Sequence, residues 1–333
     1  MTTNSPTIAL VGSWSDVLDE RRSLAAELAS AWPSGPARVS LFADTTDDQR
    51  ARLVGVPVWP EGAFGGHFTR SEFDHVILMI GARLNSILAL ARSADEGCHV
   101  WLQDDVVDID GAPIDAPTDW LPDVIASARS IIVGSDRLAG IVRQLGPDSP
   151  PVLVMPPAHP MVSPVVDTPE RVIAVAGGDN EVLRYLADTL NATLVNIDDT
   201  SVTPDVRERR LLSARAGVDV RTTERGIAST TVTHMMARGI PTITDLTAHA
   251  PFASPSLTST GLVVVDCNRN DSIVEHLRPI LDDDRIWLEA STAAKATAAA
   301  WTWNDAADVL AQWIDVVDSL PRETVRVVGA ISS

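Results

Sequence analysis

The stretch that decides the fold runs from Val218 to Thr244 and reads Val218-Asp-Val-Arg-Thr-Thr-Glu-Arg-Gly-Ile-Ala-Ser-Thr-Thr-Val-Thr-His-Met-Met-Ala-Arg-Gly-Ile-Pro-Thr-Ile-Thr244. Its pattern predicts a short strand, a Gly/Ser turn, a helix, a Gly-x-Pro break and a second strand. We expect the hydroxyls of Ser229, Thr230 and Thr231 to cap the helix by accepting hydrogen bonds from its first N–H groups. A helix that begins at a Gly-rich turn after the carboxyl end of a strand is a natural site for a phosphate.

The predicted helix has a defined end and a defined apolar face. Gly239 suits the left-handed residue that follows a helix, and Pro241 prevents the helix from continuing. Val232, Met235 and Met236 recur at spacings of three and four, which predicts that this face packs on a sheet.

Apolar runs that alternate with amphipathic helical patterns fill the rest of the chain. Runs of four to six apolar residues without polar alternation indicate parallel strands that are covered on both faces. Strands interleaved with helices imply right-handed crossovers, so we expect α/β architecture with doubly wound parallel sheets. The predicted strands lie at 7–12, 38–43, 74–81, 98–103, 130–134, 151–155, 171–176, 193–197, 218–221 and 261–266.

A proline-rich segment divides this pattern into two halves of similar size. The segment from Pro156 to Pro164 contains four prolines in nine residues and cannot sustain a helix or a central strand. We therefore predict a first domain at 1–155, a linker at 156–168, a second domain at 169–302, and a final helix with a tail at 303–333.

The composition excludes several classes of protein. A net charge of −19, with one lysine in the chain, argues against binding to nucleic acid or to a strongly anionic membrane surface. No apolar run approaches the ~20 residues that a membrane span requires. The first residues lack the features of a signal peptide, so we expect a cytoplasmic location. Cys98 and Cys267 are expected to be buried free thiols, and no Cys/His spacing suggests zinc.

Five segments, in order along the chain, give it a resemblance to a known family. Together with Ala237-Arg-Gly-Ile-Pro241, the segments 73–81, 99–105, 126–135, 154–160 and 302–303 resemble retaining GT-B glycosyltransferases of the family-4-like "glycosyl transferases group 1" type. The resemblance implies two Rossmann-like domains that face a cleft, with a nucleotide-sugar donor on the second domain and an unknown glycosyl acceptor on the first. It also implies that the final helix crosses back to the first domain, and that neither a metal nor a cofactor is required.

The resemblance also carries site residues over to this sequence. The acceptor side is expected at Gly12 and His67, and the candidates for catalysis are Gln103, Asp104 and Glu224. The expected donor-binding residues are Gly177, Gly178, Arg225, Gly226, Ser229, Thr230, Thr231 and His234.

Three polar signatures of the family are altered in this chain. The family's two glutamates around the Gly-rich loop correspond to Gly226 and His234, and Gln103 stands where relatives often have histidine. The stretch 176–181 lacks the Arg and Lys that neutralise the leaving diphosphate in the family. Arg225, which flanks the loop, is the first candidate to replace those cations.

Two functions of different classes follow from these observations. The first is a glycosyltransferase that transfers a sugar from a nucleotide-sugar donor with retention. The second is a catalytically inactive GT-B-fold protein that acts as a binding partner or scaffold of an active glycosyltransferase, because the altered signatures remove groups on which catalysis depends.

Overall fold

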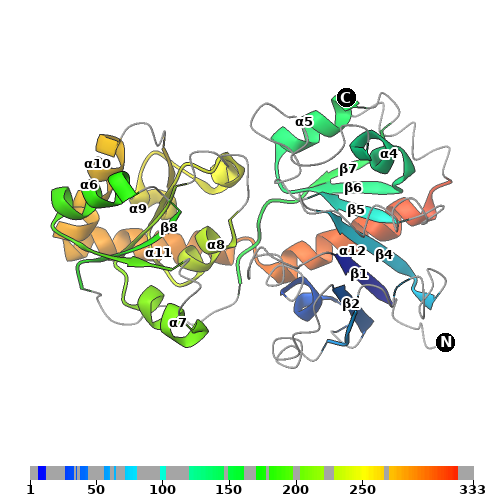
Figure 1. Cartoon of the computed structure of the whole chain (residues 1–333), viewed down its shortest axis with the longest axis horizontal. Helices are drawn as coiled ribbons and strands as arrows, with labels where there is room; N and C mark the ends of the chain where they lie inside the picture. Colours follow the sequence, from blue (N-terminus) through cyan, green and yellow to red (C-terminus); the bar gives the residue numbers. More distant parts are fainter. Residues whose placement is uncertain are drawn as a thin grey trace. The chain divides into compact units, whose positions relative to one another are not determined.

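A computed structural model gives the fold. It describes residues 7–12, 27–33, 35, 38–43, 56–60, 64, 72–80, 98–102, 120–145, 149–160, 170–177, 180–197, 203–220, 229–265 and 270–321. The chain forms two compact units (Figure 1), of which unit 1 comprises Met1–Pro156 and Trp303–Ser333 and unit 2 comprises Pro157–Thr302. Within the described ranges, no helix is both long enough and apolar enough to span a membrane.

Unit 1 is built on a parallel sheet that is doubly wound, as the sequence predicts. In its described part seven strands follow the order β3-β2-β1-β4-β5-β6-β7. The strand order reverses between β1 and β4, as it does in Rossmann-like sheets. The sequence did not predict β3. The strands are β1 (Ile8–Gly12), β2 (Val39–Ala43), β3 (Val58–Pro60), β4 (His75–Ile80), β5 (His99–Leu102), β6 (Ser130–Val133) and β7 (Val152–Val154).

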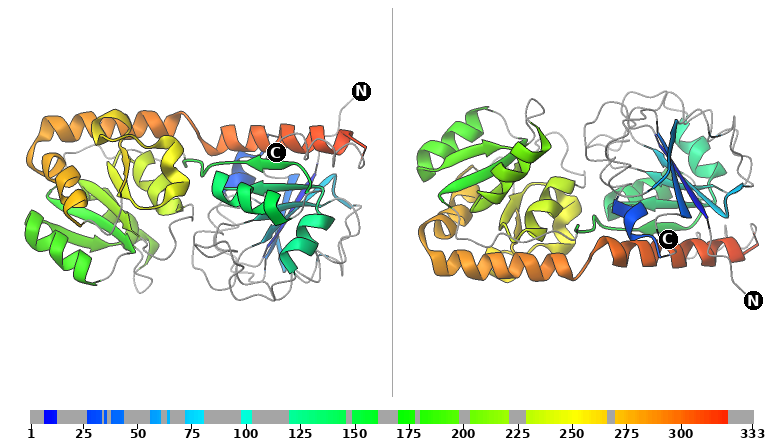
Figure 2. Two further views of the ribbon diagram at one scale, coloured as in Figure 1. Left: turned by 90° about the horizontal axis from the view of Figure 1, so that it is seen from above. Right: turned by 90° about the horizontal axis from the view of Figure 1, so that it is seen from below.

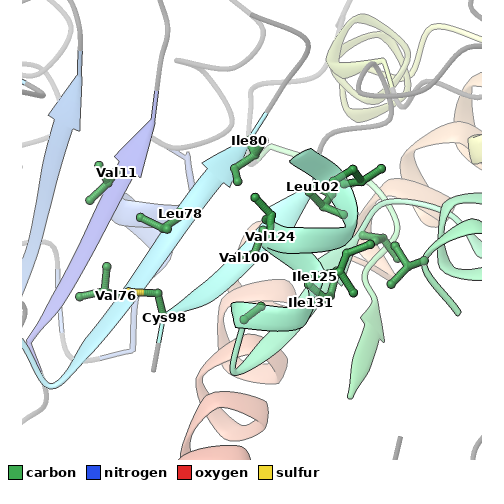
Figure 3. Packing of buried hydrophobic residues seen from close by; sticks show 14 of the residues in the cluster. Val11, Val76, Leu78, Ile80, Cys98, Val100, Leu102, Val124, Ile125 and Ile131 are labelled. Atoms are coloured by element: carbon green, nitrogen blue, oxygen red, sulfur yellow. The ribbon is translucent and has the colours of Figure 1, made fainter. Parts of the chain in front are cut away.

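Alternate residues of these strands build the core on one face of the sheet. Val76, Leu78 and Ile80 of β4 pack with apolar residues of α4 (Trp120–Ser127) and α5 (Asp136–Leu145). Figure 3 shows these β4 residues together with Val100 and Leu102 of β5 and with Val124 and Ile125 of α4. Cys98 is a buried free thiol in this cluster, as expected, whereas Cys267 lies outside the described residues.

The long helix α12 (Trp303–Ser319) covers the opposite face of the same sheet, as the two views of Figure 2 show. Arg129 holds the end of this helix, because its guanidinium donates hydrogen bonds to the carbonyls of Val317, Asp318 and Leu320. A cation is favourable at this position because the carboxyl end of a helix carries partial negative charge.

Three residues at the amino ends of sheet strands contact the Asp318 side chain. Its Oδ1 accepts from Arg129 Nε at 2.9 Å and lies 3.3 Å from His99 Nε2, while its Oδ2 lies 2.8 Å from His75 Nδ1. Burial raises the pKa of the Asp318 carboxyl, but its interactions with His75, His99 and Arg129 outweigh burial and hold the pKa below its usual range. Burial lowers the pKa of the His99 ring.

Unit 2 contains a second parallel sheet, and its described part has five strands in the order β12-β11-β10-β8-β9. One apolar cluster joins the sheet to α6, α10 and α11, and another joins it to α7 and α8 on the other face. The strands are β8 (Val172–Gly177), β9 (Thr193–Asn196), β10 (Ala216–Val220), β11 (Thr242–Thr244) and β12 (Leu262–Val264). The helices are α6 (Asn180–Leu190), α7 (Pro204–Leu212), α8 (Thr230–Ala237), the 3₁₀ helix η5 (Thr247–Phe252), α9 (Leu257–Thr260), α10 (Asn270–Asp282) and α11 (Asp284–Ala299).

The helix of the opening stretch ends as its sequence predicts. Gly239 has a φ of +78° and directly follows the C-cap residue of α8. Its N–H donates to the Met236 carbonyl and the Ile240 N–H donates to the Met235 carbonyl, which is the hydrogen-bond pattern of a Schellman motif. This ending turns the chain directly into β11.

The two segments at the ends of unit 2 are bonded to each other. Both the backbone N–H and the Nδ1 of His159 lie 3.0 Å from the Trp301 carbonyl oxygen, and His159 forms a parallel bridge with Thr302. Burial lowers the pKa of the His159 ring, which packs edge-on against Phe252. The segment that enters unit 2 is therefore tied to the segment that leaves it.

Two glycine substitutions are expected to change stability in opposite directions. Gly261 has a φ of +74°, and a Cβ there would overlap the backbone of Ala294, so Gly261→Ala should lower the free energy of unfolding by more than about 2 kcal/mol. Gly140 lies inside α5 with no atom near its added Cβ, so Gly140→Ala should raise stability by about 0.5–1 kcal/mol. Urea unfolding followed by circular dichroism measures both changes, and equal effects would contradict the described backbone.

Candidate functional site

The carboxyl ends of three neighbouring strands mark the candidate site in unit 2. β8 ends at Gly177, which pairs in register with Val220 at the end of β10, and β11 ends at Thr244. The helix α8 begins at Thr230, within the same crossover that leads from β10 to β11. In open α/β sheets, ligands bind at the carboxyl ends of the strands, so this edge is where chemistry is expected.

Three fully buried polar side chains meet at this edge, and we call them the Asp219 cluster: Asp219, Ser229 and His249. The Ser229 hydroxyl donates to Asp219 Oδ2 at 2.5 Å, and the Ser229 backbone N–H donates to His249 Nε2 at 2.9 Å. The cluster therefore joins β10, the start of α8 and η5. Buried polar groups are costly unless they are hydrogen-bonded, so this arrangement holds the three segments in one geometry.

The cluster corrects the expected role of the Ser229 hydroxyl. Ser229 is the N-cap residue of α8, as predicted, but its side chain makes no capping hydrogen bond. The hydroxyl donates to the Asp219 carboxylate instead, and hydrogen bonds to a charged acceptor are stronger than those between neutral groups. The expectation that Ser229 accepts from the helix N–H groups was therefore wrong.

The cluster also determines which groups at the start of α8 can meet an anion. The Ser229 N–H donates to His249, so this N–H is not available to an anion. The Asp219 carboxylate lies beside the amino end of the helix, where the helix dipole stabilises a negative charge. A bound phosphate would have to share this electrostatic environment with Asp219.

His234 lies in the second turn of α8 and contacts charged groups. Its Nδ1 is 3.3 Å from Nη1 of Arg238, and the same Arg238 group donates to the His234 carbonyl. The Arg238 guanidinium also pairs with Glu208 of α7 at 2.9 and 2.8 Å. His234, which is expected at the family's ribose-binding position, is therefore next to an ion pair.

The structure describes only part of the predicted site. It brings Gly177 and Ser229 to one edge of the sheet in unit 2 and places Gly12 at the carboxyl end of β1 in unit 1. Thr230 and Thr231 open α8, as expected. The predicted residues that lie outside the described part of the chain are His67, Gln103, Asp104, Gly178, Glu224, Arg225 and Gly226.

Sequence reasoning missed Asp219 and His249. Asp219 was detectable, because it is the one charged residue in the otherwise apolar strand Ala216-Gly-Val-Asp-Val220. No local pattern marks His249, since its contact with Ser229 spans 20 residues of sequence.

The hydrogen bond between Ser229 and Asp219 is expected to contribute measurably to stability. Ser229→Ala should lower the free energy of unfolding by about 1–3 kcal/mol, because it removes a donor from a buried carboxylate. The control Ser259→Ala, at an exposed position of α9, should change it by less than about 0.5 kcal/mol. A double-mutant cycle of Ser229→Ala with Asp219→Asn should give a coupling energy above about 0.5 kcal/mol. Strict additivity would mean that the two side chains do not interact.

Comparison with known proteins is informative at the level of structure. No protein-family model matches the sequence, and no curated protein matches it. Sucrose-phosphate synthase from Thermosynechococcus elongatus is similar in structure over 95% of this chain and 100% of its own, at 13% identity and a TM-score of 0.67. Anabaena HepE, in complex with UDP and glucose, is similar over 93% of this chain and 100% of its own, at 11% identity and a TM-score of 0.68.

The same fold also occurs in a domain of a protein that is named as a phosphatase. The N-terminal domain of Candida albicans trehalose-6-phosphate phosphatase is similar over 96% of this chain and 98% of its own, at 11% identity and a TM-score of 0.61. At these identities the comparison establishes the fold. The two parallel sheets with flanking helices are the architecture of the GT-B glycosyltransferase superfamily, and the chain has that fold.

Proposed function

We propose that the protein is a glycosyltransferase that transfers a sugar from a nucleotide-sugar donor to an acceptor, with retention and without a metal in the reaction. The observation that carries the proposal is the amino end of α8 at the carboxyl edge of a GT-B-type sheet, because this is a natural seat for a diphosphate. A structural neighbour with bound UDP and glucose supports the choice of donor class.

The proposed donor site uses backbone groups more than side chains. Gly177 is the last residue of β8 and Gly178 is the next residue in the sequence, and glycines at these positions allow close approach of a diphosphate. Thr230 and Thr231 are assigned to supply the first helix N–H groups. We assign Gly226 to the turn before the helix and His234 to the ribose end of the donor. Gly12 and His67 are assigned to the acceptor side, and Gln103, Asp104 and Glu224 remain the candidates for catalysis.

The chemical difficulty is the departing diphosphate, which develops about two negative charges in the transition state. The helix dipole supplies only ~0.3–1 kcal/mol at an exposed site, whereas a lost charge-assisted contact costs about 2–4 kcal/mol. The buried Asp219 adds a negative charge close to the same helix end. The transferase therefore requires a cation, and Arg225 is our candidate because it flanks the loop.

The hydrogen bonds of Asp219 and His249 at the start of α8 also favour a second function. If no cation reaches the diphosphate, Asp219 and His249 stabilise the start of α8 without a ligand, and the chain serves as a non-catalytic partner or scaffold of an active glycosyltransferase. The fold is then retained for its surface instead of its chemistry. Nucleotide binding and turnover distinguish the two functions.

Arg225→Ala tests the proposed cation. We expect it to weaken UDP or GDP binding by more than about 1 kcal/mol and to leave nucleoside binding unchanged, because a guanidinium pairs with phosphate oxygens and a nucleoside has none. Isothermal titration calorimetry measures both ligands. Arg285→Ala is the matched control, since the Arg285 side chain is 77% exposed at the start of α11. Equal losses for nucleotide and nucleoside would show that the effect is conformational and not a lost charge contact.

His234→Glu distinguishes the transferase from the scaffold. A carboxylate accepts hydrogen bonds from two ribose hydroxyls, so in a working transferase this change should tighten donor binding and raise donor hydrolysis, measured as release of nucleoside diphosphate. Arg238 lies one turn away and can pair with the new carboxylate, so the test also requires His234→Glu with Arg238→Gln. If none of these proteins binds a donor or releases nucleoside diphosphate, the transferase proposal is wrong and the scaffold function is the one supported.

A further inference from the structure

Three metal-ligating side chains meet at the amino edge of the sheet in unit 1. His75 is the first residue of β4, His99 is the first residue of β5, and Asp318 lies near the end of α12. One ligand atom from each lies within 4.8 Å of the others. The two imidazole rings face the same side of the sheet, with centroids 6.5 Å apart. Among the described residues, none of those assigned to donor, acceptor or catalysis lies at this edge.

The His99 ring is fully buried and is oriented by its neighbours. Its Nδ1 lies 2.8 Å from the Ser130 hydroxyl oxygen, which also accepts a hydrogen bond from Trp313 Nε1 at 3.1 Å. The other ring nitrogen, Nε2, is directed at Asp318 Oδ1 at 3.3 Å, without the alignment of a hydrogen bond to any group in the described chain. In the tautomer that donates its Nδ1 proton to Ser130, the Nε2 lone pair faces the carboxylate, and a cation between them would make that contact favourable.

His75 forms the side of the cluster that faces Asp315. Its Nδ1 is 2.8 Å from Asp318 Oδ2, and its Nε2 is 3.4 Å from Oδ1 of Asp315. The Asp315 side chain is 68% exposed and precedes Asp318 by about one helical turn. Asp315 therefore supplies a second, exposed carboxylate near the ligands.

Arg129 contacts Asp318 but leaves ligand atoms available. Its Nε donates a hydrogen bond to Asp318 Oδ1. One of its terminal nitrogens, Nη2, donates to three backbone carbonyls at the end of α12. Asp318 Oδ2, His75 and His99 Nε2 are not bonded to Arg129 in the described structure. The two carboxylates, Asp315 and Asp318, offset most of the charge of a divalent ion beside one guanidinium.

We propose that His75, His99 and Asp318 bind a zinc ion that fastens the end of α12 to the sheet of unit 1. Two imidazole nitrogens with one carboxylate match the ligand preference of zinc, whereas calcium and magnesium prefer sites made of oxygen alone. The Ser130 contact on the far side of His99 is the kind of supporting hydrogen bond that metal-bound histidines make. The ion would link two strands to a helix from the other end of the chain, and its role is structural.

Metal binding to the full chain tests this proposal without any measurement of activity. The protein is freed of metal with a chelator, dialysed, and titrated with zinc chloride by calorimetry and with cobalt chloride by visible spectroscopy. We expect one ion per chain, visible cobalt bands from a nitrogen- and oxygen-ligated site, and a higher unfolding temperature with zinc. His75→Gln and His99→Gln should each lower the zinc affinity at least about tenfold and remove the cobalt bands.

His276→Gln is the matched control, because His276 is a half-buried histidine of α10 in unit 2, outside the cluster. It should keep wild-type zinc binding. Circular dichroism of the metal-free variants shows that they are folded, and Asp318→Asn provides a third ligand substitution if His99→Gln fails to fold. Absence of zinc and cobalt binding in the folded wild-type chain would overturn the proposal, and so would binding of equal strength in His75→Gln and the wild type.

Discussion

Burial of both faces of two parallel sheets is the constraint on which the rest of the structure depends. In unit 1, α4 and α5 cover one face and α12 covers the other, while in unit 2 two separate apolar clusters lie on the two faces. A strand in such a sheet has no exposed face that could carry polar chemistry. Polar groups therefore gather at the strand ends, and both candidate sites of this protein lie there.

The polar cluster of unit 2 stabilises the same edge at which the donor site is proposed. Asp219 and His249 hold Ser229, and with it the start of α8, in place without any ligand. An ionised Asp219 carboxylate would make the helix end less favourable for a diphosphate, because like charges repel across a short distance in a poorly solvated environment. Any donor site there must supply compensating positive charge, and this requirement separates a transferase from a scaffold.

Much of the fold was predictable, because its signals are local. Buried parallel strands appear as short apolar runs, so β4, β5 and β8 were found within about two residues of their ends. The end of α8 was predictable because only a left-handed residue continues the chain there, and Gly239 provides it. The short strand β3 was missed because it has only three residues and ends in a proline, a residue that argues against a strand.

The polar sites were less predictable, because their contacts join distant parts of the chain. A serine before a helix predicts an N-cap. The buried Asp219, which accepts the hydrogen bond from the Ser229 hydroxyl, becomes a neighbour of Ser229 only after folding. The cluster of His75, His99 and Asp318 has no ligand spacing that a sequence motif describes, since Asp318 comes from the last described helix. Residue types can be read from a sequence, whereas the partners of buried polar groups depend on the topology.

The proposed donor site would place a nucleoside diphosphate at the carboxyl edge of the sheet in unit 2. The most direct measurement is the thermal unfolding of the full chain with UDP, GDP and ADP and with their sugars, each compared with its nucleoside. A ligand at about 100 times its dissociation constant adds about 2.7 kcal/mol of stability. If unit 2 binds a diphosphate at this edge, at least one nucleoside diphosphate will raise the unfolding temperature. The matching nucleoside at the same concentration will not raise it. Unchanged unfolding with every diphosphate and every nucleotide sugar would contradict the proposed donor site.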